Sequence, residues 1–595
     1  MKRIISSELV SYQDQQVRVE GWLHILRALG KLNFLILRDR SGLIQVVIHD
    51  KAVLDQVKDL QVGSILDITG IVKVADQAEL GVEITEPQIK VVSAVTEAMP
   101  VEINKEILKA HIDTILDYRP LSLRHASSQA IFRIQATLVA AYREFLTQNG
   151  FTEFFGPNII SASSEGGSEM FKVQYFDHEA LLSQSAQLYK QMMVGVYERV
   201  FALMKCFRAE KSNTRRHLTE ATQFEFEMGF IEDYSEVMDM LELVVKFMIA
   251  QVQEKNAKDL KILGLELAKA PQEVAFPRIT FKDALQLVFE RTGTDERNEL
   301  DLSPLAEKEL CKYAREQFGT DFIFVTNFLR KKTAFYAHPN EQDPEVTNYF
   351  DLLCREIEIA SGGQRIHEHD ALVESLKLKG LDPANFSDYL SIFKFGMPPH
   401  GGFGMGMERF TMMALGLENI RMSTLFPSDP RRIASVPLKA KVYSGTELRD
   451  EIISRLTAAG MQFQKFEHEA TLTSDQSSQI RGTELKEGVK AMILRNKKTS
   501  ENIMVCIPAD QRLDFKLLEQ LSGHKYELED KELIKTKFGL EIGGIPPFGN
   551  LLGLKTFFSK AIADNNRAAF NCGTVTDSIV MGSADLIKII EPELF

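Results

Sequence analysis

The sequence is short of cysteine. Its five cysteines are scattered along 595 residues, and no two of them form a C-x-x-C pair. This spacing argues against a disulfide framework and against a structural zinc site. We therefore expect a protein of the reducing cytoplasm that binds no zinc.

Long apolar runs are also missing. The N-terminal stretch MKRIISSELVSYQDQQ has no apolar core of the kind that a signal peptide contains. An apolar run around Leu241 to Val252 is interrupted by Lys246 and is too short to span a bilayer. We expect a soluble protein with no membrane partner.

The chain carries no excess of positive charge. Lys and Arg total 70 against 83 Asp and Glu, so the net charge is -13. A general polyanion-binding role is disfavoured, although a local basic face could still meet nucleic acid. The length and an apolar content of 44% predict three or four globular domains.

Short alternating segments fill the region from Val17 to about Val92, and Gly, Asp and Ser turns separate them. This pattern predicts a small antiparallel barrel, with a five-stranded oligonucleotide-binding (OB) barrel as one solution, in residues 1–100. Such barrels stack bases on exposed aromatic rings, and Arg27, Phe34 and Gln45 are suitable residue types. Burial statistics alone instead place Phe34 in the barrel core.

The rest of the chain predicts two further domains. Residues 101–435 mix strand patterns with helices, among them a helix with Ile131, Ile134 and Leu138 at helical spacing and another over Ser235 to Lys255. This region is expected to be one large α+β domain. A composition break at IASVPLKAKVYSG precedes an α/β-patterned block, residues 446–595, which is long enough to fold alone.

Charged residues crowd the segment FRAEKSNTRRHLTEATQFEFEMGF, residues 207–230. Arg208 and Glu210 share one face of an expected strand, and a cationic loop follows them. A rigid guanidinium beside such a loop suits a polyphosphate, whereas the alternative is a solvated surface hairpin. A second segment, GGFGMGMERF, presents Arg409 after Gly404 and Gly406, which would let backbone approach a ligand.

Together these segments resemble the three signature motifs of class II aminoacyl-tRNA synthetases. Pro157 matches the proline of motif 1, which lies at the dimer interface in that class and implies a homodimer. FRAE with its loop matches motif 2, and GFGMGMERF matches motif 3. The segments SEGGSEMF, QSAQLYKQMM, FDLLCREIEIASGGQRIH and GMPPHGGFGMGMERF are similar to the aspartyl branch of archaeal and eukaryotic type, over about residues 15 to 432.

The resemblance implies that L-aspartate and ATP form aspartyl-adenylate, which is passed to tRNA(Asp). Three alternatives stay open: an asparaginyl-tRNA synthetase, a tRNA-binding paralogue without aminoacylation, and an amide ligase of the same fold. Lys190 and Arg365 favour aspartate over asparagine, and the N-terminal barrel argues against the amide ligase.

The resemblance also assigns site residues. It implies Arg208 and Arg409 as the catalytic cations on the phosphates. For ATP it implies Arg208, Glu210, Arg216, His217, Leu218, Glu358, Gly406 and Arg409. For aspartate it implies Ser164, Glu165, Gln187, Lys190, Glu225, Ser361 and Arg365. For Mg²⁺ with ATP it implies Asp351, Glu358 and Ser361, and for the anticodon Arg27, an exposed Phe34 and Gln45.

The specificity argument rests on charge. Lys190 and Arg365 in a water-poor pocket would satisfy a carboxylate but would stay uncompensated around the neutral amide of asparagine. Two positions depart from the family pattern: Glu225 stands where many relatives have Asp for the substrate ammonium group, and Ala221 stands where some place a Phe against adenine. His24 and Pro87 accompany tRNA(Asp)-specific relatives and favour that specificity here.

The tail resembles the YbaK/prolyl-tRNA-editing family, over about residues 446 to 590. The resemblance lies in GVKAMILR and GGIPPFGN, among other segments, and implies hydrolysis of wrongly charged aminoacyl-tRNA. Lys490 would bind the tRNA terminus or the ester region, and a water would be the nucleophile. The loop Gly543 to Gly549 would hold the acyl group, with Gly544, Pro547, Phe548 and Gly549 as candidates. The alternatives are a rigid turn and a domain that binds tRNA without catalysis.

Overall fold

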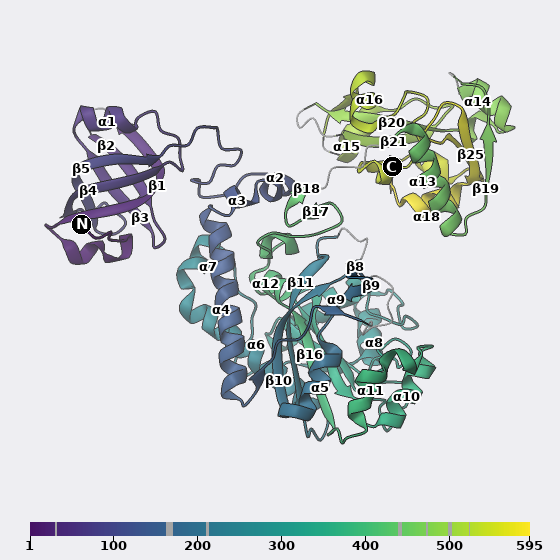
Figure 1. Cartoon of the computed structure of the whole chain (residues 1–595), viewed down its shortest axis with the longest axis horizontal. Helices are drawn as coiled ribbons and strands as arrows, with labels where there is room; N and C mark the ends of the chain where they lie inside the picture. The colour runs from purple at the N-terminus through teal and green to yellow at the C-terminus, as the bar shows by residue number, and fades with distance from the viewer. Residues whose placement is uncertain are drawn as a thin grey trace. The chain divides into compact units, whose positions relative to one another are not determined.

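The computed structural model describes residues 1–29, 32–161, 170–209, 214–437, 443–471, 474–497, 502–522 and 524–595. The chain divides into two compact units, Met1–Pro437 and Leu438–Phe595. Figure 1 labels their elements. Among the helices of the described ranges, none has the length and apolar character needed to cross a membrane. The three domain ranges expected from the sequence stay predictions.

The N-terminal region is a closed five-stranded barrel with the strand order β1-β2-β3-β5-β4, which confirms the predicted OB barrel. Along β2, burial alternates, so Asn33, Leu35 and Leu37 point into the core while Phe34 lies on the other face. The elements are η1 (Ser6–Tyr12), β1 (Gln16–Leu29), β2 (Leu32–Arg38), β3 (Leu43–Ile48), α1 (Lys51–Val57), β4 (Ile65–Val74) and β5 (Val82–Ser93).

The rest of the first unit is built on an eight-stranded sheet with the order β12-β13-β14-β15-β16-β11-β10-β6. Its central strands are antiparallel, and the helices beside them make this region the α+β domain that the sequence predicts. The strands are β6 (Thr152–Glu153), β10 (Arg199–Phe207), β11 (Glu220–Gly229), β12 (Arg278–Thr280), β13 (Phe322–Thr326), β14 (Tyr349–Cys354), β15 (Ile357–Arg365) and β16 (His400–Gly406). A small separate sheet contains β7 (Ile159–Ile160), β8 (Lys172–Tyr175) and β9 (His178–Leu182).

Helices cover this sheet, and α4 and α6 run beside each other (Figure 1). Ile131, Ile134 and Leu138 of α4 join the main hydrophobic core, as their helical spacing predicts. The helices are α2 (Ile112–Asp117), α3 (Arg119–Ser122), α4 (Ala126–Gln148), α5 (Gln187–Tyr197), α6 (Ser235–Lys255), α7 (Ala257–Leu263), α8 (Phe281–Thr292), α9 (Pro304–Phe318), α10 (His369–Leu378), α11 (Ser387–Phe393) and α12 (Met407–Leu415). The 3-10 turns η2 (Pro383–Phe386) and η3 (Ile420–Ser423) and the short pair β17 (Arg432–Ile433) and β18 (Val436–Pro437) complete it.

The second unit is an α/β domain with its own hydrophobic core. A three-stranded sheet has the order β19-β25-β24, and a five-stranded sheet has the order β22-β20-β21-β23-β26. The strands are β19 (Phe463–Glu467), β20 (Val489–Asn496), β21 (Asn502–Pro508), β22 (Tyr526–Leu528), β23 (Lys555–Phe558), β24 (Arg567–Asn571), β25 (Asp577–Gly582) and β26 (Glu593–Leu594). The helical segments are α13 (Gly445–Ala458), α14 (Ser474–Arg481), η4 (Leu485–Glu487), α15 (Phe515–Ser522), α16 (Lys531–Phe538), η5 (Gly549–Leu551), α17 (Lys560–Ala563) and α18 (Ser583–Ile590).

Candidate functional site

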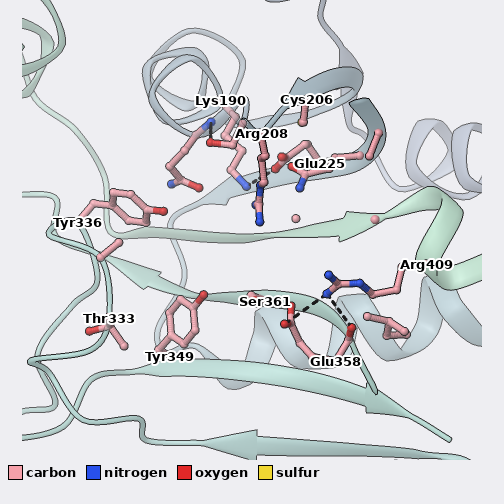
Figure 2. Close-up of a pocket in the computed structure, with 18 of the residues that line it drawn as sticks. Lys190, Cys206, Arg208, Glu225, Thr333, Tyr336, Tyr349, Glu358, Ser361 and Arg409 are labelled. Carbon is pink, nitrogen blue, oxygen red and sulfur yellow. Dashed lines mark hydrogen bonds and ion pairs between the residues drawn. The ribbon is translucent and has the colours of Figure 1, made fainter. Parts of the chain in front are cut away.

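A cavity of about 800 Å³ opens over the central strands of the eight-stranded sheet. Figure 2 shows Arg208 pointing into the space between two groups of residues, Lys190 with Glu225 and Tyr349 with Ser361 and Glu358. Arg409 reaches into the same space from α12. The cavity therefore gathers side chains that lie more than 200 positions apart along the chain.

Four residues of the charged segment that the resemblance assigns to ATP lie at this cavity. Arg208, Arg216, His217 and Leu218 all line the cavity, as does Gly406. Arg216 donates from Nη1 to Glu307 Oε2 at 2.7 Å, and His217 Nδ1 lies 2.6 Å from Thr214 Oγ1. Glu210 lies outside the described residues.

Of the three expected metal ligands, Glu358 and Ser361 line the cavity and Asp351 does not. Arg409 donates from Nη1 to the Glu358 carbonyl at 3.0 Å, and the same nitrogen lies 3.4 Å from Glu358 Oε2. Ser361 donates to Glu358 Oε1 at 2.8 Å, and Asp351 is the cross-strand neighbour of Ser361. Asp351 Oδ1 is enclosed and has no hydrogen-bond partner among the described residues. Burial and the adjacent Glu358 carboxylate raise the pKa of Asp351 well above its usual range.

Four buried charges form a closed set at one end of the cavity: Lys190, Glu225, Glu227 and Arg365. Lys190 Nζ donates to Glu225 Oε2 at 2.6 Å and lies 3.4 Å from Glu227 Oε2. Arg365 Nε donates to Glu227 Oε1 at 2.8 Å. Each of the four side chains is at most 2% exposed. The sequence analysis expected the charges of Lys190 and Arg365 to be balanced only by the substrate. This expectation is incorrect, because the carboxylates of Glu225 and Glu227 already balance them.

The two carboxylates of this set are held differently. Burial raises the pKa of Glu225, and its ion pair with Lys190 opposes that shift only in part. Burial acts in the same direction on Glu227, but its ion pairs with Arg365 and Lys190 outweigh burial and lower the pKa of this residue. Glu227 is thus the firmly ionised partner of Arg365, and Glu225 is the more weakly held carboxylate.

Glycines of β16 make room for these acids. A Cβ atom on Gly402 would lie 2.2 Å from Glu227 Oε2, and one on Gly404 would lie 3.2 Å from Glu225 Oε1. β11 and β16 are paired with Glu225 opposite Gly404 and Glu227 opposite Gly402. The glycine-rich motif therefore admits buried carboxylates as well as a ligand.

The remaining expected aspartate-site residues are partly visible. Gln187 lines the cavity and donates from Nε2 to Gln191 Oε1 at 2.9 Å. Gln191 Nε2 in turn lies 3.0 Å from His400 Nε2. Burial lowers the pKa of His400 to about 4, so the imidazole ring is neutral at pH 7. Ser164 and Glu165 lie outside the described residues.

The sequence analysis missed Glu227 and Glu408. Strand alternation places Glu227 on the same face as Glu225, and this spacing of two was the available signal. Glu408 precedes Arg409 and lines the cavity, where it accepts a hydrogen bond from the Thr222 backbone at 2.9 Å. Nothing in the sequence distinguishes Glu408 from a solvated helix residue.

The expected anticodon residues share the outer face of the barrel. Arg27 is exposed and is the cross-strand partner of half-buried Phe34, which corrects the burial-based placement of Phe34 in the core. Gln45 lies on the neighbouring strand and donates from Nε2 to Glu83 Oε2 at 2.8 Å. Arg27, Gln45 and His24 line a cavity of about 200 Å³.

The second unit contains a separate cavity of about 380 Å³. Exposed Lys490 lines it, together with Gly543 and Ile545 of the expected loop. The other loop candidates do not reach the cavity. Gly544 packs against the backbone of Thr574, and Pro547, Phe548 and Gly549 are buried, since Phe548 packs on Phe570 and a Cβ on Gly549 would meet Thr556.

Three family models match separate parts of the chain. Residues 111–430 match the model described as tRNA synthetases class II (D, K and N). Residues 17–92 match the OB-fold nucleic acid binding domain, and residues 468–589 match the aminoacyl-tRNA editing domain.

Curated relatives and solved structures agree with the first of these matches. The chain is 41% identical over 432 residues to the aspartate–tRNA(Asp/Asn) ligase of Thermus thermophilus, which covers 72% of this chain and 99% of the relative. It is 41% identical to the aspartate–tRNA(Asp) ligase of Pyrococcus horikoshii, over 70% of this chain and 96% of the relative. Among solved structures, asparaginyl-tRNA synthetase of Pyrococcus horikoshii with asparaginyl-adenylate aligns with a TM-score of 0.67 at 32% identity, over 73% of this chain and 99% of that one. Aspartyl-tRNA synthetase of Entamoeba histolytica aligns with a TM-score of 0.65 at 32% identity, over 73% and 93%.

Proposed function

This chain belongs to the class II tRNA synthetases (D, K and N), and we propose that it joins L-aspartate to tRNA(Asp) in an ATP-dependent reaction. The observation that carries the proposal is the position of Lys190 and Arg365, which line the same cavity as Arg208 and Arg409. Cations suited to the substrate side chain and cations suited to phosphates therefore share one cavity.

The reaction runs in two steps. A substrate carboxylate oxygen attacks the α-phosphorus of ATP, pyrophosphate leaves, and aspartyl-adenylate forms. A terminal ribose hydroxyl of the tRNA then attacks the acyl carbon, and AMP leaves. Arg208 stabilises the negative charge that grows on the α-phosphate, and Arg409 and His217 hold the outer phosphates.

The oxygen atoms of Asp351, Glu358 and Ser361 are suitable ligands for Mg²⁺. Asp351 has an enclosed oxygen without a partner, and Glu358 and Ser361 supply further oxygen donors beside it. Oxygen ligands are those that Mg²⁺ prefers, and the ion usually completes its shell with water and substrate phosphates. When bound, the ion would neutralise phosphate charge, and Asp351, Glu358 and Ser361 would hold it.

Aspartate selectivity follows from an exchange of ion pairs. The substrate ammonium group takes over Glu225, which is the more weakly held carboxylate, and this releases Lys190 to pair with the substrate side chain. Apart from the α-carboxylate, which reacts with ATP, aspartate adds one positive ammonium group and one negative side-chain carboxylate, so the buried set of four charges stays balanced. Asparagine adds only the ammonium charge, and a buried site with an unpaired charge is costly. Glu225, which stands where many relatives have Asp, accepts from Lys190 Nζ at 2.6 Å, and this contact supports the proposed exchange.

ATP–pyrophosphate exchange with aspartate and asparagine side by side tests the proposal, followed by charging of tRNA(Asp) and tRNA(Asn). We expect exchange with aspartate only. Equal exchange with asparagine would contradict it and would favour the asparaginyl alternative. Charging of tRNA(Asn) as fast as tRNA(Asp) would contradict the specificity that His24 and Pro87 favour.

We propose the outer face of the barrel as the anticodon-binding surface. Arg27 and Phe34 lie side by side across two strands, which suits stacking of a base beside a cation. Phe34→Ala is expected to raise the KM for tRNA and to leave ATP–pyrophosphate exchange unchanged.

For the second unit we propose deacylation of wrongly charged tRNA. A water adds to the acyl carbon, the ester bond breaks, and the ribose hydroxyl leaves. Lys490 is exposed at the cavity and suits a phosphate or ester oxygen of the tRNA terminus. The full-length Lys490→Ala variant should lose deacylation of mischarged tRNA while ATP–pyrophosphate exchange persists.

We also propose a cytoplasmic homodimer. Phe155 is 82% exposed and Ile159 is 50% exposed, on either side of the motif 1 residue Pro157. Such apolar exposure favours an interface. Light scattering of the purified protein should give twice the chain mass, and Phe155→Asp should shift it to monomer.

A further inference from the structure

The cavity of the second unit contains a buried arginine. Arg481 is the last residue of α14, is only 9% exposed, and lines the cavity together with Lys490. Lys490 is exposed, so the two cations differ in depth. Arg481 is the enclosed one.

No carboxylate neutralises Arg481 among the described residues. Its Nη2 donates to Asn571 Oδ1, while its enclosed Nε has no hydrogen-bond partner. Asn571 is itself held, because its Nδ2 donates to the Gly543 carbonyl and its Oδ1 accepts from Ser578 Oγ at 3.1 Å. Burial lowers the pKa of Arg481 to about 10, so the guanidinium is still charged at pH 7. A buried charge without a counter-ion is costly, and an arriving anion would relieve that cost.

Several hydroxyl groups line the same cavity as this cation. Thr483 lines the same cavity, and its Oγ1 is enclosed and unpartnered among the described residues. Ser477 donates to Thr471 Oγ1 at 2.8 Å, and both line the cavity. The carboxylate of Glu529 also lines it, but Lys537 at 2.9 Å and Asn502 at 2.7 Å already hold that group. The cavity that contains Arg481 therefore offers further hydrogen-bond donors to an anion.

We propose that Arg481 and Thr483 bind a carboxylate on the acyl side chain of the aminoacyl-tRNA that this domain hydrolyses. The inference rests on the proposed deacylase function. In such an ester the α-carboxyl group is esterified, so a carboxylate of the acyl group can only be on its side chain. The substrate class is thus aspartyl and glutamyl esters of tRNAs to which that amino acid does not belong, in preference to their amide counterparts.

The other anion of the substrate is a tRNA phosphodiester. A phosphodiester joins two nucleosides and is best met by an exposed cation such as Lys490, whereas an enclosed guanidinium in a cavity of about 380 Å³ is reached by a small side chain. The remaining lining is largely apolar, including Ile493, Ile534 and Ala569, and suits the methylene groups of an acyl chain.

The test measures deacylation by the full-length protein without ATP, AMP or pyrophosphate, so that the synthetase site cannot reverse its reaction. Aspartyl, asparaginyl, glutamyl and glutaminyl esters are compared on one tRNA sequence. We expect the acidic esters to be hydrolysed at least about tenfold faster than the amides. Arg481→Met should bring the two rates together by slowing only the acidic esters, Arg481→Lys should keep most of the preference, and the surface variant Arg455→Met should behave as wild type.

Three outcomes would overturn the inference. The first is a wild-type preference for the amides. The second is an Arg481→Met variant that folds but in which hydrolysis of all four esters is slowed by the same factor. This result indicates that Arg481 has a structural role or binds a tRNA phosphate. Phosphate binding is identified if inorganic phosphate inhibits hydrolysis of all four esters. If no ester is hydrolysed, the deacylase proposal is refuted, and a binding measurement then tests the present inference. The ligands are aspartyl- and asparaginyl-adenosine with a stable 3′-amide link. The third overturning outcome is equal affinity of the protein for these two ligands.

Discussion

Arg365→Met is the most informative perturbation of the synthetase site. The exchange removes the guanidinium that donates to Glu227 Oε1 at 2.8 Å, in a place where both side chains are at most 2% exposed. Removing one partner of a buried ion pair costs about 3–5 kcal/mol, because the other charge stays behind unpaired. Lys190, 3.4 Å from Glu227, offsets part of this cost, so we expect the lower end of the range.

The double variant Arg365→Met/Glu227→Gln separates stability from specificity. It removes both charges, so most of the lost free energy of unfolding should return in urea titrations. The aspartate side chain still lacks its second cation. A hydrogen bond to a charged group contributes about 1.5–3 kcal/mol, so the ratio of kcat/KM for aspartate over asparagine should fall roughly 10- to 150-fold in ATP–pyrophosphate exchange.

Lys246→Met is the matched control. Lys246 forms a buried pair with Glu242 at 2.7 Å in α6, and neither residue lines the cavity. It should lower stability without changing the ratio. If the double variant keeps the wild-type ratio, Arg365 does not read the substrate side chain, and the part of the charge argument that rests on Arg365 fails.

Three further predictions concern separate parts of the chain. Arg208→Ala should reduce kcat of ATP–pyrophosphate exchange by at least about 100-fold, as expected for a group that stabilises transition-state charge, and an unchanged kcat would contradict its role. Gly549→Ala should lower the stability of the second unit by about 1–3 kcal/mol in thermal unfolding, because the new Cβ atom would lie 2.2 Å from Thr556 Oγ1. ATP–pyrophosphate exchange should persist in this variant. Unchanged stability would show that the surrounding residues relax freely. Asp39 is buried, which opposes ionisation, but hydrogen bonds from Ser6 and Ser41 outweigh burial and lower its pKa. The stabilisation that Asp39 contributes is therefore complete above the unfolded pKa of about 3.9 and is lost as the pH falls through the lower folded pKa. Asp39→Asn should make the unfolding free energy of the barrel depend less steeply on pH in this acidic range. An unchanged pH dependence would argue against this linkage.

Local pattern determined much of the architecture. Period-two alternation in residues 17–92 is a property of the strands themselves, and it predicted the barrel that the structure contains. The helix over Ser235 to Lys255 was predictable for the same reason, since its apolar spacing follows one helical face. Arg208 and Arg409 could be named as candidates because their motifs are short and contiguous, and both line the cavity.

Burial and pairing were decided by the tertiary structure. The sequence places Glu227 two residues from Glu225. Only the pairing of β11 and β15 with the two edges of β16 shows that Arg365, 138 positions away, neutralises Glu227. The same holds for Arg481, whose lack of a counter-ion depends on where α14, β24 and the Gly543 loop meet. Periodicity is encoded in neighbouring residues, whereas the electrostatic balance of a buried site depends on groups that are brought together only when the chain folds.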